Sequence, residues 1–177
     1  MNRWLGLLVF SIILLAVNGC SQGQNPGQAQ PTTGGKVESV TETEGNQLEI
    51  QLFFADDQAL DLLEAKENLV FENENDKYKK AYLALTKSPD EKMVSLWEEN
   101  DLEQVSFDEG TGTLTFDFKI TDQLGSSGER LQILSLLNTM FQFQEVNKIQ
   151  INNQGQESLN GHVDITEPFT REMIAGL

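Results

Sequence analysis

Alternating apolar and polar residues predict strands in the part of the chain that follows residue 46. In "LEIQLFF" every second residue is apolar, which is typical of a strand with one buried face. That face would consist of Leu48, Ile50, Leu52 and Phe54. The next apolar stretch, residues 59–72, is also predicted to be extended.

A hairpin is predicted further along the chain. "LEQVSFD" at 102–108 and "TLTFDFKI" at 113–120 both alternate, and "EGTG" between them supplies the turn. Another strand is expected at 147–153, followed by the turn "NQGQ" and a closing segment at 161–169.

Helical spacing replaces this alternation in three places. Residues 75–87 predict a helix, because one stripe of apolar side chains recurs with a helical period: Tyr78, Ala81, Tyr82 and Leu85. Residues 88–100 are expected to form a second short helical piece, with Pro89 near its first turn. The longest helix should begin at "GSSGE", residues 125–129.

This mixture of strands, hairpins and helices lacks the regular rhythm of a parallel α/β sheet. It favours an α+β fold, in which two helices pack on one face of a small mixed or antiparallel sheet. Residues 47–177 are predicted to be one domain, since a stretch of this length can bury a core.

The first 46 residues predict export and anchoring. Arg3 precedes an apolar run from Leu5 to Val17, which has the length of a secretory signal and is too short to span a bilayer. Cys20 is the only cysteine, and "VNGC" is similar to the site where bacterial lipoproteins are cleaved and lipidated. We therefore expect a signal peptide at 1–19 and lipidation of Cys20. The alternative is an ordinary secretory signal that ends near a cysteine.

Residues 20–46 are predicted to be a disordered tether, because they are polar and rich in Gly, Gln and Thr. The net charge of −16, which becomes −17 if Arg3 is removed with the signal, disfavours nucleic acid and anionic lipid head groups as partners. Attachment to the membrane would thus depend on the lipid, and the expected location is the outer face of the cytoplasmic membrane.

The "GSSGE" segment could be a phosphate-binding loop, the seat of a serine nucleophile, or a helix start. A phosphate loop needs a Lys followed by Ser or Thr, but Glu129 stands there. A nucleophile needs a base, and the one histidine, His162, is far along the chain. The pattern S-x-x-E instead predicts a capping box between Ser126 and Glu129.

Other candidate sites have simpler structural interpretations. A single histidine seldom makes a transition-metal site, so His162 is expected to form structural hydrogen bonds. The acid pairs Asp56-Asp57 and Asp108-Glu109 lack the spacing of a calcium loop and are expected in turns. Trp97 could mark a partner surface, although burial is favoured. No metal, cofactor or catalytic residue is therefore predicted.

The run from "GSSGERLQILSLLNTMFQFQEV" to "GHVDITEP" resembles the GerM domain, a sporulation and germination module of endospore-forming bacteria. The first strand and first helix also look like those of the domain, whereas "LWEENDLEQV" departs from its pattern. The matching positions are Gly125, Ser126, Glu129, Leu137, Asn138, Thr139, Phe143, Val146, Ile149, Gly155, Gly161, His162, Asp164 and Pro168.

This resemblance implies a single non-catalytic domain that is similar to the ring-building domains of sporulation channels and acts outside the cytoplasm. Its expected partners are an envelope protein or a second copy of the chain, bound for example at an open sheet edge. A peptidoglycan- or glycan-binding module is the alternative, because the Asn/Gln-rich segment near 150–160 could bind sugars. A hydrolase is a third hypothesis, although the sequence offers no nucleophile–base pair.

Overall fold

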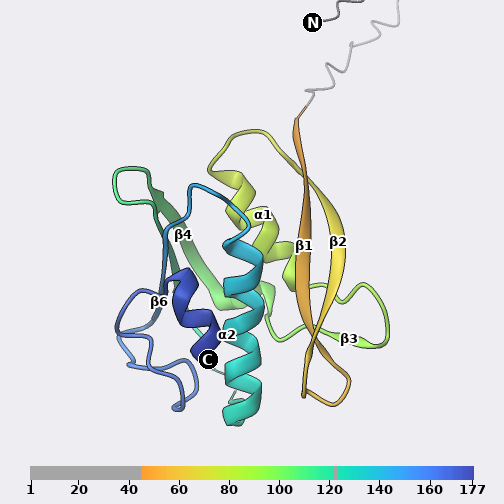
Figure 1. Cartoon of the computed structure of the whole chain (residues 1–177), viewed down its shortest axis with the longest axis vertical. Helices are drawn as coiled ribbons and strands as arrows, with labels where there is room; N and C mark the ends of the chain where they lie inside the picture. Colours follow the sequence, from red (N-terminus) through yellow and green to blue (C-terminus); the bar gives the residue numbers. More distant parts are fainter. Residues whose placement is uncertain (1–44, 122) are drawn as a thin grey trace, which may run out of the picture. The chain divides into compact units, whose positions relative to one another are not determined.

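The structure, a computed structural model, describes residues 45–121 and 123–177. The predicted signal peptide, the lipidation site at Cys20 and nearly all of the predicted tether lie outside the described residues. The described part contains two three-stranded sheets (Figure 1). One has the strand order β2-β1-β3 and the other has the order β4-β5-β6.

Strands β1 (Asn46–Asp56) and β2 (Leu62–Phe71) form a long antiparallel pair, in which Gln51 lies opposite Lys66. Both extended segments were predicted from the sequence. On the inner face of β1, Ile50, Leu52 and Phe54 are buried, but Leu48 is 37% exposed. The predicted apolar face of β1 is therefore too long by one residue, because the strand begins beyond the core.

The second sheet combines an antiparallel and a parallel pair. Strands β4 (Leu102–Asp108) and β5 (Thr113–Phe118) form the predicted hairpin, and β6 (Lys148–Asn153) runs parallel to β5. The turn of the hairpin needs a glycine at Gly112, whose φ is +67°. A Cβ atom there would also lie 2.2 Å from the Asn147 side chain.

Helix α1 (Asp76–Leu85) buries the predicted stripe of Tyr78, Ala81, Tyr82 and Leu85. The Tyr78 ring centroid lies 5.1 Å from that of Phe107 on β4, and the Tyr82 ring lies 5.6 Å from Phe118 on β5. Because α1 also contacts β1 and β2, it packs against both sheets.

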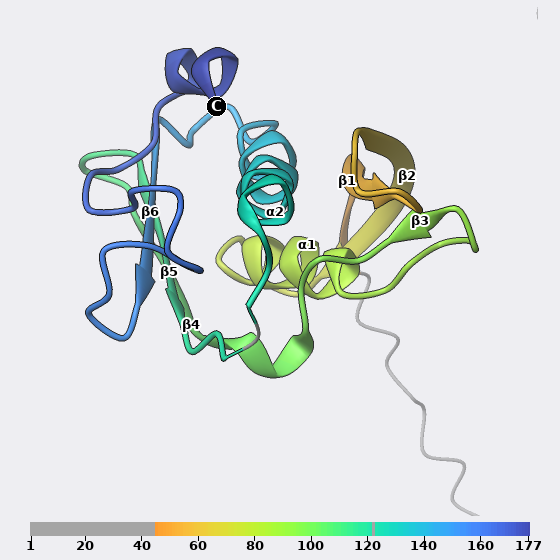
Figure 2. The same cartoon turned by 90° about the horizontal axis from the view of Figure 1, so that it is seen from below.

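Helix α2 (Ser126–Met140) lies between the two sheets (Figures 1 and 2). Most of its residues are buried, polar ones such as Gln132, Ser135 and Thr139 included. Polar side chains on such a helix are usually satisfied inside the domain, and this accounts for several of the contacts described below. Thr139 is an exception, because its buried hydroxyl has no hydrogen-bond partner among the described residues.

The helix predicted at residues 88–100 is wrong. This segment contains the short strand β3 (Met93–Val94), which pairs with Ala55 and Asp56, and the 3₁₀ turn η1 (Glu99–Asp101). Its apolar residues serve separate contacts: Met93 joins the sheet, and Trp97 is buried beside α2. Tertiary packing therefore overrides the local helical tendency.

The α+β class is confirmed, in the form of two small sheets rather than one, with both helices between them. After β6 the chain continues through a long loop to a final 3₁₀ segment, η2 (Arg171–Gly176). Phe169, just before η2, exchanges backbone hydrogen bonds with Ile149 and so covers part of the outer edge of β6.

Candidate functional site

The "GSSGE" segment opens α2, but the predicted capping box is wrong. The N-cap is Gly125, and the helix start has no side-chain cap hydrogen bond. Ser126 is already the first helical residue and is exposed, so its hydroxyl lies one position too late to cap. The backbone N–H of Glu129 donates to the carbonyl of Gly125 at 2.9 Å, as part of the helix itself.

The carboxylate of Glu129 instead holds a distant loop. Its side chain is fully buried, and Oε1 accepts the backbone N–H groups of Asn160 and Val163 at 3.0 and 3.2 Å. Oε2 accepts the N–H of His162 at 2.8 Å. Hydrogen bonds to a carboxylate are stronger than those between neutral groups, so Glu129 fixes residues 160–163 against α2.

The backbone of this loop turns at Gly161, where φ is +98°. His162 contributes its backbone N–H to Glu129, while the residue as a whole is exposed. The carboxylate of Asp164 accepts the backbone N–H and the hydroxyl of Thr166, and these hydrogen bonds lower the pKa of Asp164. Gly161, His162 and Asp164 thus shape one loop.

Other polar side chains of α2 form hydrogen bonds with residues 96 and 97, in the segment that leads into β4. Trp97 is buried and donates its indole N–H to Ser135 Oγ at 2.9 Å. Gln132 donates to the carbonyl of Leu96 at 2.7 Å and accepts from the Asn160 side chain at 3.1 Å. Of the two interpretations of Trp97, the structure shows burial.

The remaining motif residues lie elsewhere in the domain. Asn138 and Thr139 stand near the end of α2, Val146 is buried beyond it, and Gly155 has a φ of +77° in the turn after β6. Pro168 precedes the bridge between Phe169 and Ile149. The structure therefore brings together Glu129, Gly161 and His162 and distributes the other motif residues along the fold.

Two side chains that hold loops and strand edges in place, Arg171 and Gln142, could not be identified from the sequence. Arg171 donates to the carbonyls of Phe141, Phe143 and Val146, and thereby closes the loop after α2. Gln142 accepts the N–H of Gln51 at 2.9 Å and donates to its carbonyl at 2.5 Å. Neither residue lies in a periodic stretch, so only the tertiary fold reveals its partners.

Lys77 and Glu145 form a partly buried ion pair at 2.6 Å. The Lys77 ammonium also lies 2.7 Å from Glu74 Oε2, and Tyr78 donates its hydroxyl to Glu145 at 2.9 Å. Burial opposes the charge on both partners, but the hydrogen bonds outweigh it: they raise the pKa of Lys77 and lower that of Glu145. Burial, with the Glu145 hydrogen bond, also raises the pKa of the Tyr78 hydroxyl.

The predicted acid pairs lie where β1 and β4 end and turns begin: Asp56 and Asp108 are the last strand residues, and Asp57 and Glu109 are in the turns. Asp56 Oδ1 accepts the backbone N–H of Leu60 at 2.7 Å, and Asp108 accepts from Thr111 and Gly110 at 2.8 and 2.9 Å. Those two hydrogen bonds lower the pKa of Asp108. Within residues 45–121 and 123–177, no group of three or more His, Cys, Asp or Glu side chains is placed to hold a metal ion.

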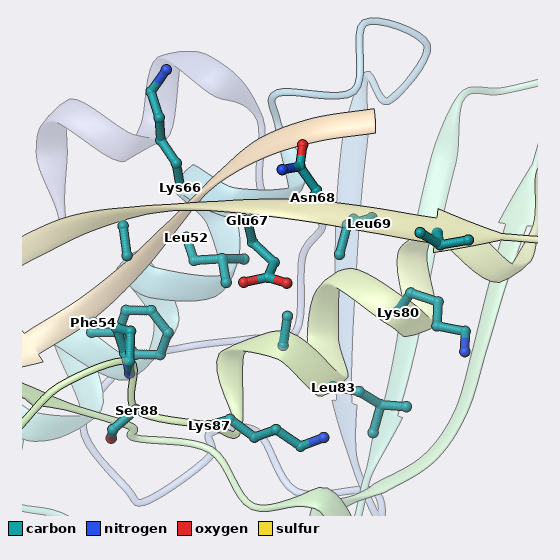
Figure 3. A pocket seen from close by; sticks show the side chains of 14 residues that line it. Leu52, Phe54, Lys66, Glu67, Asn68, Leu69, Lys80, Leu83, Lys87 and Ser88 are labelled. Carbon is teal, nitrogen blue, oxygen red and sulfur yellow. The ribbon is translucent and has the colours of Figure 1, made fainter. Parts of the chain in front are cut away.

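A groove of about 420 Å³ runs between β2 and α1 (Figure 3). Its apolar lining comes from both sheet and helix, including Leu52, Phe54, Leu69, Leu83 and Ala84. Glu67 points from β2 toward the helix, whereas Lys80 and Lys87 line the groove on the α1 side (Figure 3). This groove opens beside the outer edge of β2.

In the part of the chain that the structure describes, the outer edge of β2 is unpaired. β2 is the border strand of its sheet (Figure 1) and pairs there with β1 alone, and Glu64, Lys66, Asn68 and Val70 are all exposed. An open strand edge presents unpaired backbone N–H and C=O groups that can pair with another chain. The described part of the chain contains no helix that is long and apolar enough to cross a membrane.

A comparison with protein families gave a match over much of the described chain. The model of the Germane family, described as sporulation and spore germination, matches residues 51–159, which is more than half of the chain. A comparison with curated proteins gave no match.

Solved structures share the fold. A Clostridium perfringens protein provisionally described as a lipoprotein has a TM-score of 0.51 and 19% identity, over 74% of this chain and 92% of that protein. The first GerMN domain of the Bacillus subtilis sporulation protein GerM has a TM-score of 0.55 and 16% identity, over 71% of this chain and 98% of the domain.

The tandem GerMN domains of the same Bacillus subtilis protein give a TM-score of 0.52 and 18% identity. That alignment covers 77% of this chain but 49% of the tandem protein, so this chain spans about half the length of the tandem. The described fold thus corresponds to a single domain of this type.

Proposed function

Because this chain belongs to the Germane family of sporulation and spore germination domains, we propose that it is a non-catalytic protein-interaction module of the bacterial cell envelope. Its partner is another envelope protein or a second copy of the chain, and its role is in sporulation or germination. The observation that carries this proposal is the open outer edge of β2, which lies beside an apolar groove.

The arrangement of the motif residues supports a non-catalytic role. Glu129 is engaged by three backbone N–H groups, and His162 reaches that cluster through its own backbone. Gln150 and Asn152, which a glycan-binding module could have used, donate to the Ile165 carbonyl and to Asp117. These side chains are therefore occupied in holding the domain together.

The proposed location is the outer face of the cytoplasmic membrane, with residues 20–46 as the tether of a domain anchored through lipidated Cys20. The sequence "VNGC" after a short apolar run supports this proposal, as does the likeness to a Clostridium perfringens protein provisionally described as a lipoprotein. The strongly acidic surface keeps the domain away from anionic lipid head groups, so it is free to meet a protein partner.

Crosslinking in intact cells, followed by identification of the linked proteins, tests this function. We expect an envelope protein, or a second copy of the chain, in the linked complexes. The mass of the mature chain checks the anchor, because it should begin at a Cys20 that carries acyl groups. A mature domain that stays monomeric and links to no envelope protein would contradict the proposed function.

A further inference from the structure

The outer edge of β2 and the groove beside it have the features of a binding site for an extended peptide. We propose that an acidic segment of a partner protein, with aliphatic residues between its carboxylates, adds to β2 as a further strand and lies in the groove between β2 and α1. This inference rests on the proposed function and specifies the class of partner.

The backbone geometry shows which groups of β2 are available. Gln51 exchanges hydrogen bonds with Gln142, so its N–H and C=O point away from β2. Lys66 lies opposite Gln51 in an antiparallel pair, and its own N–H and C=O must therefore point outward from the sheet. The same holds for every second residue of the strand: Glu64, Asn68 and Val70 share the orientation of Lys66.

These outward groups have no backbone or side-chain partner in the part of the chain that the structure describes. An added strand would lie about 4.8 Å outside β2 and would satisfy them. Side chains on one face of that strand would then point toward α1, into the groove lined by Leu83 and Ala84.

The residues on the α1 side of the groove indicate which side chains a bound peptide would carry. Lys80 and Leu83 belong to α1, and Lys87 lies two residues beyond its end at Leu85, so the aliphatic residue falls between the two lysines along this side. Strand residues on one face repeat about every 7 Å. Two carboxylates on one face of an added strand, with an aliphatic side chain between them, would therefore follow the same order as the two lysines and Leu83.

Both ammonium groups are available for such a ligand. Neither Lys80 nor Lys87 has a carboxylate within ion-pair distance among the described residues. The groove has one acidic lining residue, Glu67, against Lys80 and Lys87; Lys66 also borders it, but its ammonium lies on the other side of β2 (Figure 3) and pairs with Glu49 at 2.8 Å. In a chain with a net charge of −16, this is a local excess of positive charge.

The other sheet edges are less suited to an acidic strand. The outer edge of β1 is covered at Gln51 by Gln142, and that of β6 is bridged by Phe169. Strand β4 also has an open edge, but Glu103, Asp108 and Glu109 lie on or beside it. The β2 strand of a second copy does not have the required pattern, because its Glu64 and Glu67 are three residues apart and lie on opposite faces.

The test uses the full chain in detergent micelles and the synthetic peptide acetyl-Ser-Glu-Thr-Val-Thr-Glu-Ser-amide. Binding is measured by fluorescence anisotropy with a labelled peptide. We expect the double variant Lys80→Glu/Lys87→Glu to weaken binding by about ten-fold or more, since two ion pairs become repulsive. The matched control, Lys119→Glu/Lys148→Glu, makes the same change in net charge at two exposed residues, one just after β5 and one at the start of β6, and should leave binding almost unchanged.

Hydrogen exchange gives an independent readout on the unmodified chain. Peptide binding should protect the backbone N–H groups of residues 64, 66, 68 and 70, whereas the N–H groups of residues 63, 65, 67 and 69 already face β1. Protection elsewhere, or equal binding of a peptide in which both Glu are replaced by Lys, would overturn the proposal. Equal weakening by both double variants would overturn it as well.

Failure of this test is distinguishable from failure of the proposed function. If the peptide does not bind but crosslinking in cells still yields an envelope partner, strand addition at β2 is wrong and the interaction module stands. If crosslinking also yields no partner, both proposals fall.

Discussion

At Glu129 a carboxylate on the first turn of α2 meets three backbone N–H groups from residues 160–163. The sequence pattern singled out this residue but not its role. S-x-x-E describes only local spacing, and a carboxylate at that position can turn back to the helix start or reach a distant loop. The choice depends on where Gly125 places the first helical residue and on the loop that packs against it.

Substitutions of Glu129 and Ser126 should therefore differ strongly in how much they destabilise the domain. Glu129→Gln replaces one acceptor oxygen by a donor that faces a backbone N–H, and we expect a loss of about 2–4 kcal/mol in the free energy of unfolding. Ser126→Ala removes an exposed hydroxyl that does not cap the helix, so it should change the free energy of unfolding by less than about 0.5 kcal/mol. Urea unfolding measures both values.

Glu167→Gln is the control, because it makes the same chemical change at an exposed position in a neighbouring loop. Hydrogen exchange should become faster at residues 160, 162 and 163 in Glu129→Gln alone. A capping box would be supported instead if Ser126→Ala cost about 1 kcal/mol and Glu129→Gln left the 160–163 loop protected.

The ion pair between Lys77 and Glu145 predicts a pH dependence of stability. The folded pKa of Glu145 lies below its ordinary value of 4.5, so its contribution is present above that pH and is lost as the pH falls through the folded pKa. The pKa of Lys77 is raised above 10.5, so its contribution is present below that pH and is lost as the pH rises through the raised value.

We expect Glu145→Gln to destabilise the domain by about 0.5–1 kcal/mol at neutral pH, because the pair is only partly buried. The difference in the free energy of unfolding between this variant and the unmodified chain should shrink as the pH falls below 4.5. Chemical unfolding across this range measures it, with the exposed Glu157→Gln as reference. If the two free energies of unfolding still differ by the same amount well below pH 4.5, the charge of Glu145 does not contribute to stability.

At the scale of elements, periodicity predicted those strands and helices that bury one continuous face. β1, α1 and β5 each combine a regular apolar stripe with a single packing surface, so their sequence pattern carries the information. Residues 88–100 fail because Met93 and Trp97 contact different elements. The parallel pairing of β6 with β5 also had no local signal, since it depends on the path of α2 between them.

The edge of β1 gives a prediction at this scale. The Gln142 carboxamide takes the place of a neighbouring strand at Gln51, so Gln142→Ala should accelerate hydrogen exchange of the Gln51 N–H and cost about 1 kcal/mol. Gln144→Ala, two residues away and exposed, is the matched control. Unchanged exchange at Gln51 would mean that other groups protect this edge.

For the whole molecule, the sequence predicts an order of parts but not the groove beside β2. A short apolar run, a lone cysteine and a polar stretch are linear features, so export, anchoring and tethering are predicted without a fold, and they stay predictions. The groove could not be predicted, because Lys80 on α1, Lys87 just beyond it and Val70 on β2 line one surface only when α1 packs against β2. The sequence suggested an open sheet edge in general terms, and the structure identifies β2 as that edge beside a groove.

Site-specific photo-crosslinking in intact cells tests the central claim most directly. A photoreactive side chain would replace Asn68 on the outer edge of β2 or, as the control, Gln154 in the turn after β6; both positions are exposed. The account predicts that the chain reactive at position 68 links to an envelope protein, while the chain reactive at position 154 does not link to that protein. Equal linking from both positions, or linking from position 154 alone, would contradict it.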